Sequence, residues 1–282
     1  MISSDLVSME SVAMRGFLVA VMVLGAVSAA HAADMPDLPI LRGGFADGLS
    51  ASRVNWEGFY VGGQGGLGTS DMDFTGATKD LATKLLFDTA IQNAGDVSDW
   101  PLGGKVSTHG HGFGAFAGYN AQWEDVVLGL ELSYMHGSFG GSQTDSMTRI
   151  FTDSNGTTDT VTYQADGSVK LTDMASARLR AGYAWGIFLP YAFGGMALGQ
   201  ADIVKTASIY GTQVGTGFNV PFYLSATDAQ NSRFVYGYSW GLGVDVMLMS
   251  GLFLRGEWQY SRYAASIDTA VNTFHVGLGY KF

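Results

Sequence analysis

The end of the chain has a regular pattern in which large apolar side chains alternate with small or polar ones. The last ten residues read T-F-H-V-G-L-G-Y-K-F. Phe274, Val276, Leu278 and Tyr280 fall on one face, while His275 and the glycines fall on the other. A period of two is typical of a β-strand whose two faces meet different surroundings. The chain is therefore predicted to end inside a strand.

The same alternation recurs along the chain and predicts eight strands separated by turn-like stretches. They cover residues 56–69, 107–120, 125–137, 171–185, 190–201, 234–248, 251–264 and 271–282. The connections 121–124, 186–189 and 249–250 are short, whereas 71–106, 138–170 and 202–233 are long and 265–270 lies between them in length. Transmembrane barrels combine short periplasmic turns with long external loops. The predicted fold class is all-β, an eight-stranded antiparallel up-and-down transmembrane β-barrel with long extracellular loops.

The composition of the two strand faces separates a membrane barrel from a soluble one. A lipocalin-type barrel would turn its apolar face inward and its other face to water. Here the other face consists of Gly, Ser and a few charges, which is too poor in charge for a soluble surface. The apolar face is therefore predicted to contact lipid. The other face then lines the lumen, where its charged residues must pair. The predicted lumen network is Glu131, Arg178, Arg180, Asp245, Arg255, Glu257 and Lys281. It is interpreted as a stabilising plug, with a gate for small solutes as the alternative.

Aromatic residues are predicted to form two belts at the membrane interfaces, where amphipathic rings are favoured. The periplasmic belt consists of Trp56, Tyr119, Trp123, Tyr183, Trp185 and Tyr191, together with the C-terminal Tyr280 and Phe282. The outer belt consists of Tyr134, Tyr236, Tyr238, Tyr260 and Tyr263. A sorting of aromatics into two levels supports a membrane barrel more strongly than their abundance does.

The N-terminus predicts export. Residues 17–30 form an uncharged apolar run that follows Arg15, and Ala30-His31-Ala32 is a small-x-small cleavage site. Residues 1–32 are therefore predicted to be a secretory signal peptide, with Met14 as a candidate true start. The run is shorter than the roughly 20 residues that a spanning helix needs. Residues 33–55, which contain Pro36 and Pro39, are predicted to be a periplasmic linker before the barrel at 56–282.

The net charge and the absence of cysteine argue against several classes of partner and site. The formal net charge is −10, which disfavours nucleic acid as a partner because nucleic-acid binding needs a basic surface. The sequence contains no cysteine, so disulfides and Cys-ligated metals are excluded. We expect no cofactor.

Two local patterns point to structure in the long loops. Residues 79–92 place Leu81, Leu85 and Leu86 at helical spacing and predict a short amphipathic helix. Asn155-Gly156 and Asp166-Gly167 are both turn signals. The alternating residues around Asp166-Gly167 predict a hairpin with its turn at that position.

Candidate chemistry outside the lumen is sparse. His109 and His111 share a face at the start of a predicted strand and are weak candidates for binding a metal or haem. Catalysis requires a nucleophile, a base and an orienting group. His136 and His109 are expected near the outer rim, but no motif accompanies them, so the chain is not expected to be an enzyme.

Several stretches resemble the small outer-membrane β-barrel proteins of alphaproteobacteria, known as porin-family or surface-antigen proteins and related to the OmpA transmembrane barrel. They are N-W-E-G-F-Y-V-G-G-Q-G-G at 55–66, G-A-F-A-G-Y-N-A-Q-W at 114–123, V-L-G-L-E-L-S-Y at 127–134, A-R-L-R-A-G-Y-A-W at 177–185, L-P-Y-A-F-G-G-M-A at 189–197 and the last strand. In that family the terminal aromatic belongs to a signal read by the outer-membrane assembly machinery. The resemblance implies this role for Phe282, with Tyr280 in support.

The sequence thus predicts an integral protein of the Gram-negative outer membrane. Its expected role is non-enzymatic, in envelope integrity and surface display. A narrow porin for small hydrophilic solutes is the alternative, and a surface binder of haem or metal is the third hypothesis. The expected partners are outer-membrane lipid, lipopolysaccharide and, during biogenesis, the assembly machinery. The oligomeric state is left open.

Overall fold

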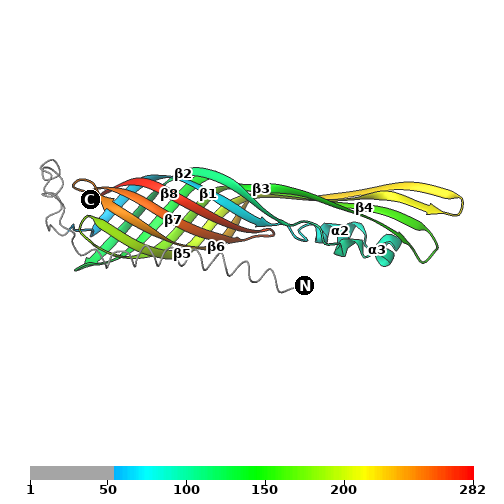
Figure 1. Ribbon diagram of the computed structural model, residues 1–282, viewed down its shortest axis with the longest axis horizontal. Helices are drawn as coiled ribbons and strands as arrows, with labels where there is room; N and C mark the ends of the chain where they lie inside the picture. The colour runs from blue at the N-terminus through cyan, green and yellow to red at the C-terminus, as the bar shows by residue number, and fades with distance from the viewer. Residues whose placement is uncertain (1–53) are drawn as a thin grey trace, which may run out of the picture. The chain divides into compact units, whose positions relative to one another are not determined.

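The computed structural model describes residues 54–282, which form a closed barrel of eight antiparallel strands (Figure 1). Each strand pairs with its neighbours in the chain, and β1 pairs with β8 to close the ring. The strands are β1 Gly58–Asp73, β2 Lys105–Trp123, β3 Val126–Thr152, β4 Thr158–Tyr183, β5 Phe188–Gly215, β6 Phe218–Met247, β7 Leu252–Ala264 and β8 Asp268–Lys281. The predicted fold class is confirmed.

Closure explains why alternation continues to the end of the chain. The register of β8 against β1 runs from Asp268 opposite Asp73 to Lys281 opposite Tyr60. The Phe282 amide then donates to the Phe59 carbonyl at 2.9 Å. In hydrocarbon no water is present to satisfy a free strand edge, so a spanning sheet has to close. The last residues complete that closure.

Four strands are far longer than the sequence predicted. β3, β4, β5 and β6 contain 27, 26, 28 and 30 residues, whereas a tilted strand crosses a bilayer with about 9–11. The segments 138–170 and 202–233, expected as loops, are therefore mostly strand. They continue β3–β6 as an open four-stranded sheet beyond the barrel, called here the external sheet (Figure 1).

The turn prediction at Asp166-Gly167 is wrong, because both residues lie inside β4. The β3–β4 turn is at the other signal, Asn155-Gly156, where Gly156 has φ +79°. The Asp153 carboxylate accepts from the amides of Asn155 and Thr157 at 2.8 and 2.9 Å. This side chain satisfies the backbone of the turn, which favours that position for the reversal.

Register shifts mark the level at which the external sheet leaves the barrel. They lie between His136 and Phe139 in β3, between Leu171 and Asp173 in β4 and between Ala201 and Ile203 in β5. Bulges bend and twist a strand and are common at barrel rims. Within the barrel the outward side chains are large and apolar, whereas above the shifts they are mainly Ser and Thr. We therefore place the outer membrane boundary at this level.

The β1–β2 connection covers one face of the external sheet. It forms α2 Lys79–Leu85, α3 Ala90–Gly95 and the 3₁₀-helix η3 Val97–Asp99. The single helix predicted at 79–92 is interrupted at Asp88, which has φ +56°. Leu81, Leu86 and Trp100 from this segment pack against Val161, Tyr163 and Ile209 of the sheet. The connection is therefore a folded cover.

A buried hydrogen bond joins the cover to the sheet. The hydroxyls of Thr78 and Tyr163 lie 2.7 Å apart. Burial raises the pKa of the Tyr163 phenol, and the Thr78 bond opposes this shift in part. The tyrosine therefore remains a neutral partner at physiological pH.

Two N-terminal predictions fall largely outside this structure. The signal peptide at 1–32 lies outside the described residues, and so does the linker at 33–55 except for residues 54 and 55. None of the helices between residues 54 and 282 is long and apolar enough to cross a bilayer.

Placing a charge on the lipid-facing wall should destabilise the barrel. Val276 lies outward in β8 and is 51% exposed in the absence of lipid. We expect Val276→Arg to lower the free energy of unfolding by about 2–4 kcal/mol, the cost of Arg near the bilayer midplane. Urea unfolding of protein refolded in lipid vesicles, followed by tryptophan fluorescence, measures this.

Ile150→Arg is the matched control, because Ile150 is 69% exposed on the external sheet. It should change the unfolding free energy by no more than about 0.5 kcal/mol. Equal effects of the two substitutions would contradict the assignment of the lipid-facing wall.

Candidate functional site

The most concentrated chemistry lies in the lumen, where three carboxylates meet three guanidinium groups. Glu131 comes from β3, Arg178 and Arg180 from β4, Asp245 from β6, and Arg255 and Glu257 from β7. Each is at most 3% exposed. Their inward direction follows from the strand period of two, since the residues on either side of them face lipid. The six formal charges of this lumen network sum to zero.

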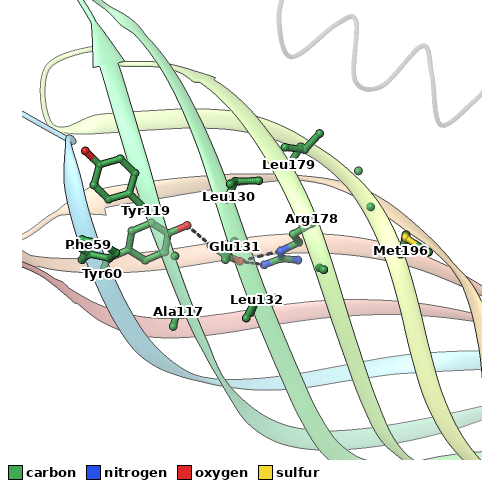
Figure 2. A pocket seen from close by; sticks show the side chains of 14 residues that line it. Phe59, Tyr60, Ala117, Tyr119, Leu130, Glu131, Leu132, Arg178, Leu179 and Met196 are labelled. Atoms are coloured by element: carbon green, nitrogen blue, oxygen red, sulfur yellow. Dashed lines mark hydrogen bonds and ion pairs between the residues drawn. The ribbon is translucent and has the colours of Figure 1, made fainter.

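Glu131 is at the centre of the lumen network and contacts all three arginines. Its carboxylate accepts from Arg178 Nε at 2.8 Å and from Arg255 Nη1 at 2.9 Å. Arg180 Nη1 donates to it at 3.2 Å. The Tyr60 hydroxyl adds a bond of 2.6 Å, which Figure 2 shows together with the Arg178 pair. Removing Glu131 would leave these donors without their shared acceptor.

Each of the other carboxylates joins two cations or a cation and a phenol. Asp245 accepts from Arg180 Nη2 at 2.7 Å and from Arg255 Nε at 2.8 Å. Glu257 accepts from Arg178 Nη1 at 2.7 Å and from the Tyr191 hydroxyl at 2.7 Å. This pairing meets the requirement that buried ions be both paired and hydrogen-bonded.

Aromatic rings fill the space around the guanidinium groups. Arg180 lies 3.8 Å from the centroid of Tyr191, Arg255 lies 3.9 Å from that of Phe116, and Arg178 lies 4.1 Å from that of Phe193. Cation–π contacts of this kind strengthen when they are desolvated.

Glycines on the opposing strands make room for these rings. A Cβ on Gly243 would come within 2.4 Å of Tyr191 Cζ. The lumen network is therefore packed in aromatic surroundings.

Two of these phenols were misread or missed in the sequence. Tyr191 was predicted in the periplasmic belt, but it is 6% exposed and points into the lumen. The physical reason is that β5 turns odd-numbered residues inward, and the glycine opposite gives the ring its place. Tyr60 was not singled out. Its inward direction was readable, because it shares a face with the glycines at positions 62, 66 and 68.

An apolar layer, called here the inner seal, closes the lumen on the short-turn side of the network. It contains Trp56, Tyr60, Phe116, Val127, Leu189 and Phe253. Trp56, predicted in the periplasmic belt, is only 1% exposed and is corrected to this seal. It precedes β1 and turns under the barrel, where its amide donates to Gln122 Oε1 at 2.6 Å. Its ring meets Phe253 edge-on, with centroids 6.1 Å apart.

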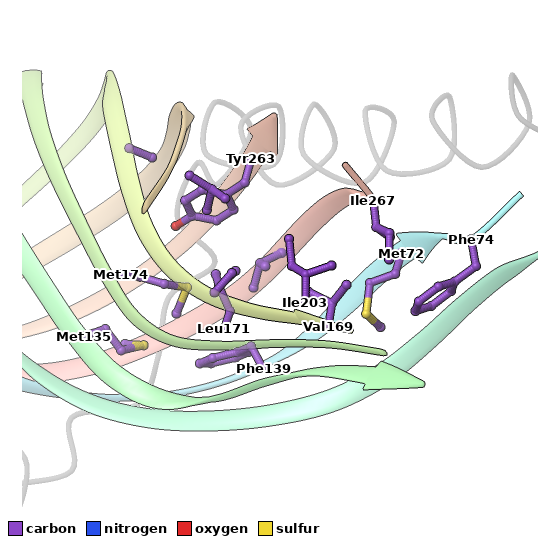
Figure 3. Packing of buried hydrophobic residues seen from close by; sticks show 14 residues of the cluster. Met72, Phe74, Met135, Phe139, Val169, Leu171, Met174, Ile203, Tyr263 and Ile267 are labelled. Carbon is purple, nitrogen blue, oxygen red and sulfur yellow. The ribbon is translucent and has the colours of Figure 1, made fainter. Parts of the chain in front are cut away.

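A larger apolar layer, called here the outer seal, fills the lumen on the side of the external sheet (Figure 3). It contains Met72, Phe74, Met135, Phe139, Val169, Leu171, Met174, Ala197, Ala201, Ile203, Val235, Tyr263, Ile267 and Val271. Figure 3 shows Met135, Phe139, Leu171 and Ile203 converging from β3, β4 and β5. Tyr263 joins this seal and is 1% exposed, so its predicted place in the outer belt is wrong. It follows the inward parity of Arg255 and Glu257 on the same strand. The network thus lies between two apolar seals.

A thin polar layer separates the network from the outer seal. Ser133, Gln259, Thr273 and His275 line a cavity of about 20 Å³. That is room for about one water molecule. His275 Nδ1 lies 3.5 Å from Glu257 Oε1, and His275 is 3% exposed. The cavity is too small for a solute.

Lys281 does not join the lumen network. Its Nζ donates to the Glu57 carbonyl at 2.9 Å and reaches the Phe282 carbonyl at 3.4 Å. The residue faces the lumen side but lies at the end of β8, so its long side chain ends at the rim. Tyr280 and Phe282 are exposed, and their rings meet edge-on with centroids 5.2 Å apart.

The remaining belt residues point outward. The exposed ones are Tyr119, Trp123, Tyr134, Tyr183, Trp185, Tyr236, Tyr238 and Tyr280, together with Phe282, and Tyr260 is half-buried. At the outer level the Tyr134 hydroxyl donates to Asp173 at 2.6 Å, and His136 Nδ1 lies 2.9 Å from the same oxygen. A polar cluster beside tyrosine fits the headgroup level of a bilayer.

Two apolar grooves lie on the outer wall where small residues interrupt the large ones. They have volumes of about 650 and 580 Å³ and share Ala117, Leu132, Ala177 and Met196. Figure 2 shows the first, with Phe59, Leu130 and Met196 around it. Both belong to the lipid-facing wall and are suited to hydrocarbon.

The two histidines singled out in the sequence lie on the outer wall of β2. His109 and His111 are exposed and pair with Thr69 and Leu67 of β1. Between residues 54 and 282, no group of three or more His, Cys, Asp or Glu is arranged to hold a metal ion.

Comparisons with known proteins agree with the fold. A family model described as outer membrane protein beta-barrel domain matches residues 19–282. The chain is 28% identical over 170 residues to the 25 kDa outer-membrane immunogenic protein of Brucella ovis, a match that covers 60% of this chain and 62% of that protein. It is 25% identical over 240 residues to the 22 kDa outer membrane protein of Rhizobium leguminosarum bv. viciae, covering 81% of this chain and 79% of that one.

Among solved structures, the chain resembles Ail, the attachment invasion locus protein of Yersinia pestis. The TM-score is 0.35 at 15% identity, and the match covers 80% of this chain and 99% of the other. For Neisserial surface protein A the TM-score is 0.36 at 11% identity, covering 79% and 97%.

Removing the shared acceptor should destabilise the barrel strongly. We expect Glu131→Ala to lower the free energy of unfolding by about 3–5 kcal/mol, because three guanidinium groups lose a buried partner. Equilibrium urea unfolding in lipid vesicles measures the loss. Glu57→Ala, at an exposed carboxylate next to β1, is the control and should stay within about 0.5 kcal/mol of wild type. Unfolding of Glu131→Ala at the wild-type urea midpoint would show that the network carries no stability.

Proposed function

Because the chain belongs to the outer membrane protein β-barrel domain family, we propose that it is a sealed membrane anchor that presents its external sheet at the cell surface. It is an integral protein of the Gram-negative outer membrane. The proposed role is non-enzymatic and combines envelope integrity with surface display.

One observation carries this proposal: an apolar seal lies on each side of the paired charges. Phe253 of the inner seal and Phe139 of the outer seal are 2% and 0% exposed. Eight strands leave an interior just wide enough to be filled by side chains. A hydrated ion would have to displace both seals and break the network between them. The narrow-porin hypothesis is therefore disfavoured.

The proposed partners follow from the surfaces of the barrel. The apolar wall and its two grooves are suited to lipid acyl chains, and the polar rim around Asp173 and His136 is suited to the headgroups of lipopolysaccharide. The exposed rings of Tyr280 and Phe282 at the end of β8 are proposed as the signal read by the assembly machinery. The composition of these surfaces supports the two lipid partners, and the family resemblance supports the assembly signal.

The external sheet supports a surface role. Strand pairing continues without a flexible break from the barrel into the sheet, and the α2–η3 cover packs on one face of it. Connections longer than about 12–15 residues are uncommon in compact domains and are usually either functional or linkers, and the paired strands and packed cover here are unlike a linker. The barrel is thus a rigid base for this sheet.

Planar-bilayer recording separates an anchor from a pore. We expect the refolded wild-type protein to show no steady single-channel openings, because both seals block the lumen. Glu131→Ala, if refolded, should also be silent, because the seals lie on either side of the network. Steady openings in the wild type, or openings that appear on removing Glu131 alone, would favour the narrow pore and contradict the sealed anchor. A known porin in the same bilayer is the positive control.

A further inference from the structure

We propose that the uncovered face of the external sheet binds an extended, uncharged polysaccharide chain of the lipopolysaccharide layer. This inference rests on the proposed surface role, since it needs the sheet to stand outside the membrane. The composition of that face differs from both an ordinary protein surface and an apolar interface.

The hydroxyl face, as it is called here, has six rows of four residues. It consists of the even positions of residues 142–152, 158–168 and 204–214 and the odd positions of residues 219–229. These strands lie in register, so that Thr148, Thr162, Tyr210 and Tyr223 form one continuous row. The opposite face carries the apolar residues Val161, Tyr163 and Ile209, which pack against the α2–η3 cover. The hydroxyl face is the continuation of the lipid-facing wall.

Sixteen of the 24 positions are Ser, Thr or Tyr, and a single one, Asp166, is charged. A soluble surface is designed with about 25–35% charged residues, roughly six to eight in 24 positions, and this chain's own charged fraction of 14% would give about three. Thr is common in strands for its propensity alone, but propensity does not explain the loss of Lys, Glu and Arg in a chain with a net charge of −10. Lys170 and Asp202 lie opposite each other in the β4–β5 register at the base of the sheet, below the first row.

Hydrogen bonds across the strands hold six of these hydroxyls in fixed positions. Thr148 and Thr162 are joined at 2.8 Å, Thr206 and Thr227 at 3.0 Å, and Ser208 and Ser225 at 3.1 Å. A hydroxyl has one donor hydrogen and two acceptor lone pairs, so each joined pair keeps capacity for a ligand. Neighbouring strands lie about 4.8 Å apart, which gives a regular spacing of polar groups across the rows. The face is a preorganised array of donors and acceptors.

Two tyrosines supply an apolar platform within this array. Tyr210 and Tyr223 stack with ring centroids 6.2 Å apart and planes inclined by 29°. They are 37% and 67% exposed. Rigid aromatic rings give contact area at low entropic cost. A pyranose ring has an axial C–H face that packs on an aromatic ring and equatorial hydroxyls that bond to its surroundings.

This chemistry disfavours the other candidate occupants. Acyl chains need an apolar surface, which this face lacks. Sulfated or phosphorylated polymers need cations, and the one charged side chain here, Asp166, is an anion that accepts from Thr144 at 2.5 Å. A protein interface has an apolar core, which short hydroxyl side chains do not provide. A neutral saccharide matches the hydroxyls, the tyrosines and the lack of charge together.

The source of the saccharide is the lipopolysaccharide layer around the barrel. The first row of the hydroxyl face begins directly above the register shifts that mark the outer membrane boundary, where lipopolysaccharide sugars surround the barrel. A tethered neighbour has a high effective concentration, so a weak contact per sugar is sufficient for binding.

The test measures binding of full-length protein, refolded in detergent micelles, to immobilised saccharides. The probes are the delipidated neutral polysaccharide of the producing strain, cellohexaose as an unrelated neutral chain and dextran sulfate as an anionic one. We expect wild type to bind the neutral polysaccharide. The double variant Tyr210→Ala, Tyr223→Ala should bind about tenfold more weakly, the equivalent of about 1.4 kcal/mol.

A second variant keeps the shape of the face and removes hydroxyls. Thr148→Val with Thr162→Val preserves two β-branched side chains in a strand and should weaken binding severalfold. Phe87→Ala is the control, because Phe87 is 80% exposed between α2 and α3 in the cover. Each variant is first checked for the mobility shift in SDS that distinguishes a folded barrel from a boiled one.

Unchanged binding by both folded variants would overturn the proposal, and so would preference for dextran sulfate. Binding of cellohexaose but not of the delipidated polysaccharide would overturn the choice of source. Failure of the surface role is seen separately, because Ser154→Cys, at the exposed β3–β4 turn of a chain without cysteine, would then not be labelled by a membrane-impermeant maleimide added to whole cells. A surface-exposed sheet that binds no neutral saccharide leaves the anchor role intact and removes this inference alone.

Discussion

The hydrogen-bonding demand of the backbone in hydrocarbon is the constraint on which the rest of this structure depends. Every amide and carbonyl within the lipid needs a protein partner, and among sheets a closed barrel alone provides one at each position. Closure requires β8 to meet β1, which is why the alternating pattern continues to the last residue. Closure with eight strands also fixes a narrow lumen. That lumen has to be filled, and the seals and charges fill it.

The placement of charges in the middle of that filling has a consequence for strand register. A buried network is seldom more stable than an apolar core of the same volume, so stability alone does not account for it. A slip of one residue would turn Glu131 or Arg178 toward lipid and exchange every inward side chain for an outward one. Because of the lumen network, a wrong register between β3 and β4 is energetically very unfavourable. The glycines opposite Tyr191 and Phe253 act in the same direction, because a Cβ would not fit beneath these rings in the observed register.

The barrel could be predicted from the sequence because lipid and lumen impose opposite demands on alternate residues. The network members on β3, β4, β6 and β7 could be identified for the same reason, as charges on a face of small residues. Trp56, Tyr191 and Tyr263 were misassigned, because a large ring suits both an interface and a lumen seal, and residue type alone does not separate the two. The directions of the Tyr191 and Tyr263 rings depended on register and on the glycine opposite each of them. Trp56 precedes β1, and its place in the inner seal depended on how the chain enters the barrel.

The strands of the external sheet were not predicted from the sequence, for a different physical reason. Above the membrane boundary the outward face changes from large apolar residues to Ser and Thr, so the contrast that reveals a membrane strand weakens. The inward residues Val161, Tyr163 and Ile209 still alternate, but their partner is the α2–η3 cover, which is distant in sequence. The covered face of the external sheet continues the lumen face of the barrel, and the hydroxyl face continues the lipid face. The strand pairing that continues from the barrel, bent at the register shifts, thus fixes the orientation of the hydroxyl face. The side chains of the hydroxyl face do not contact the barrel interior.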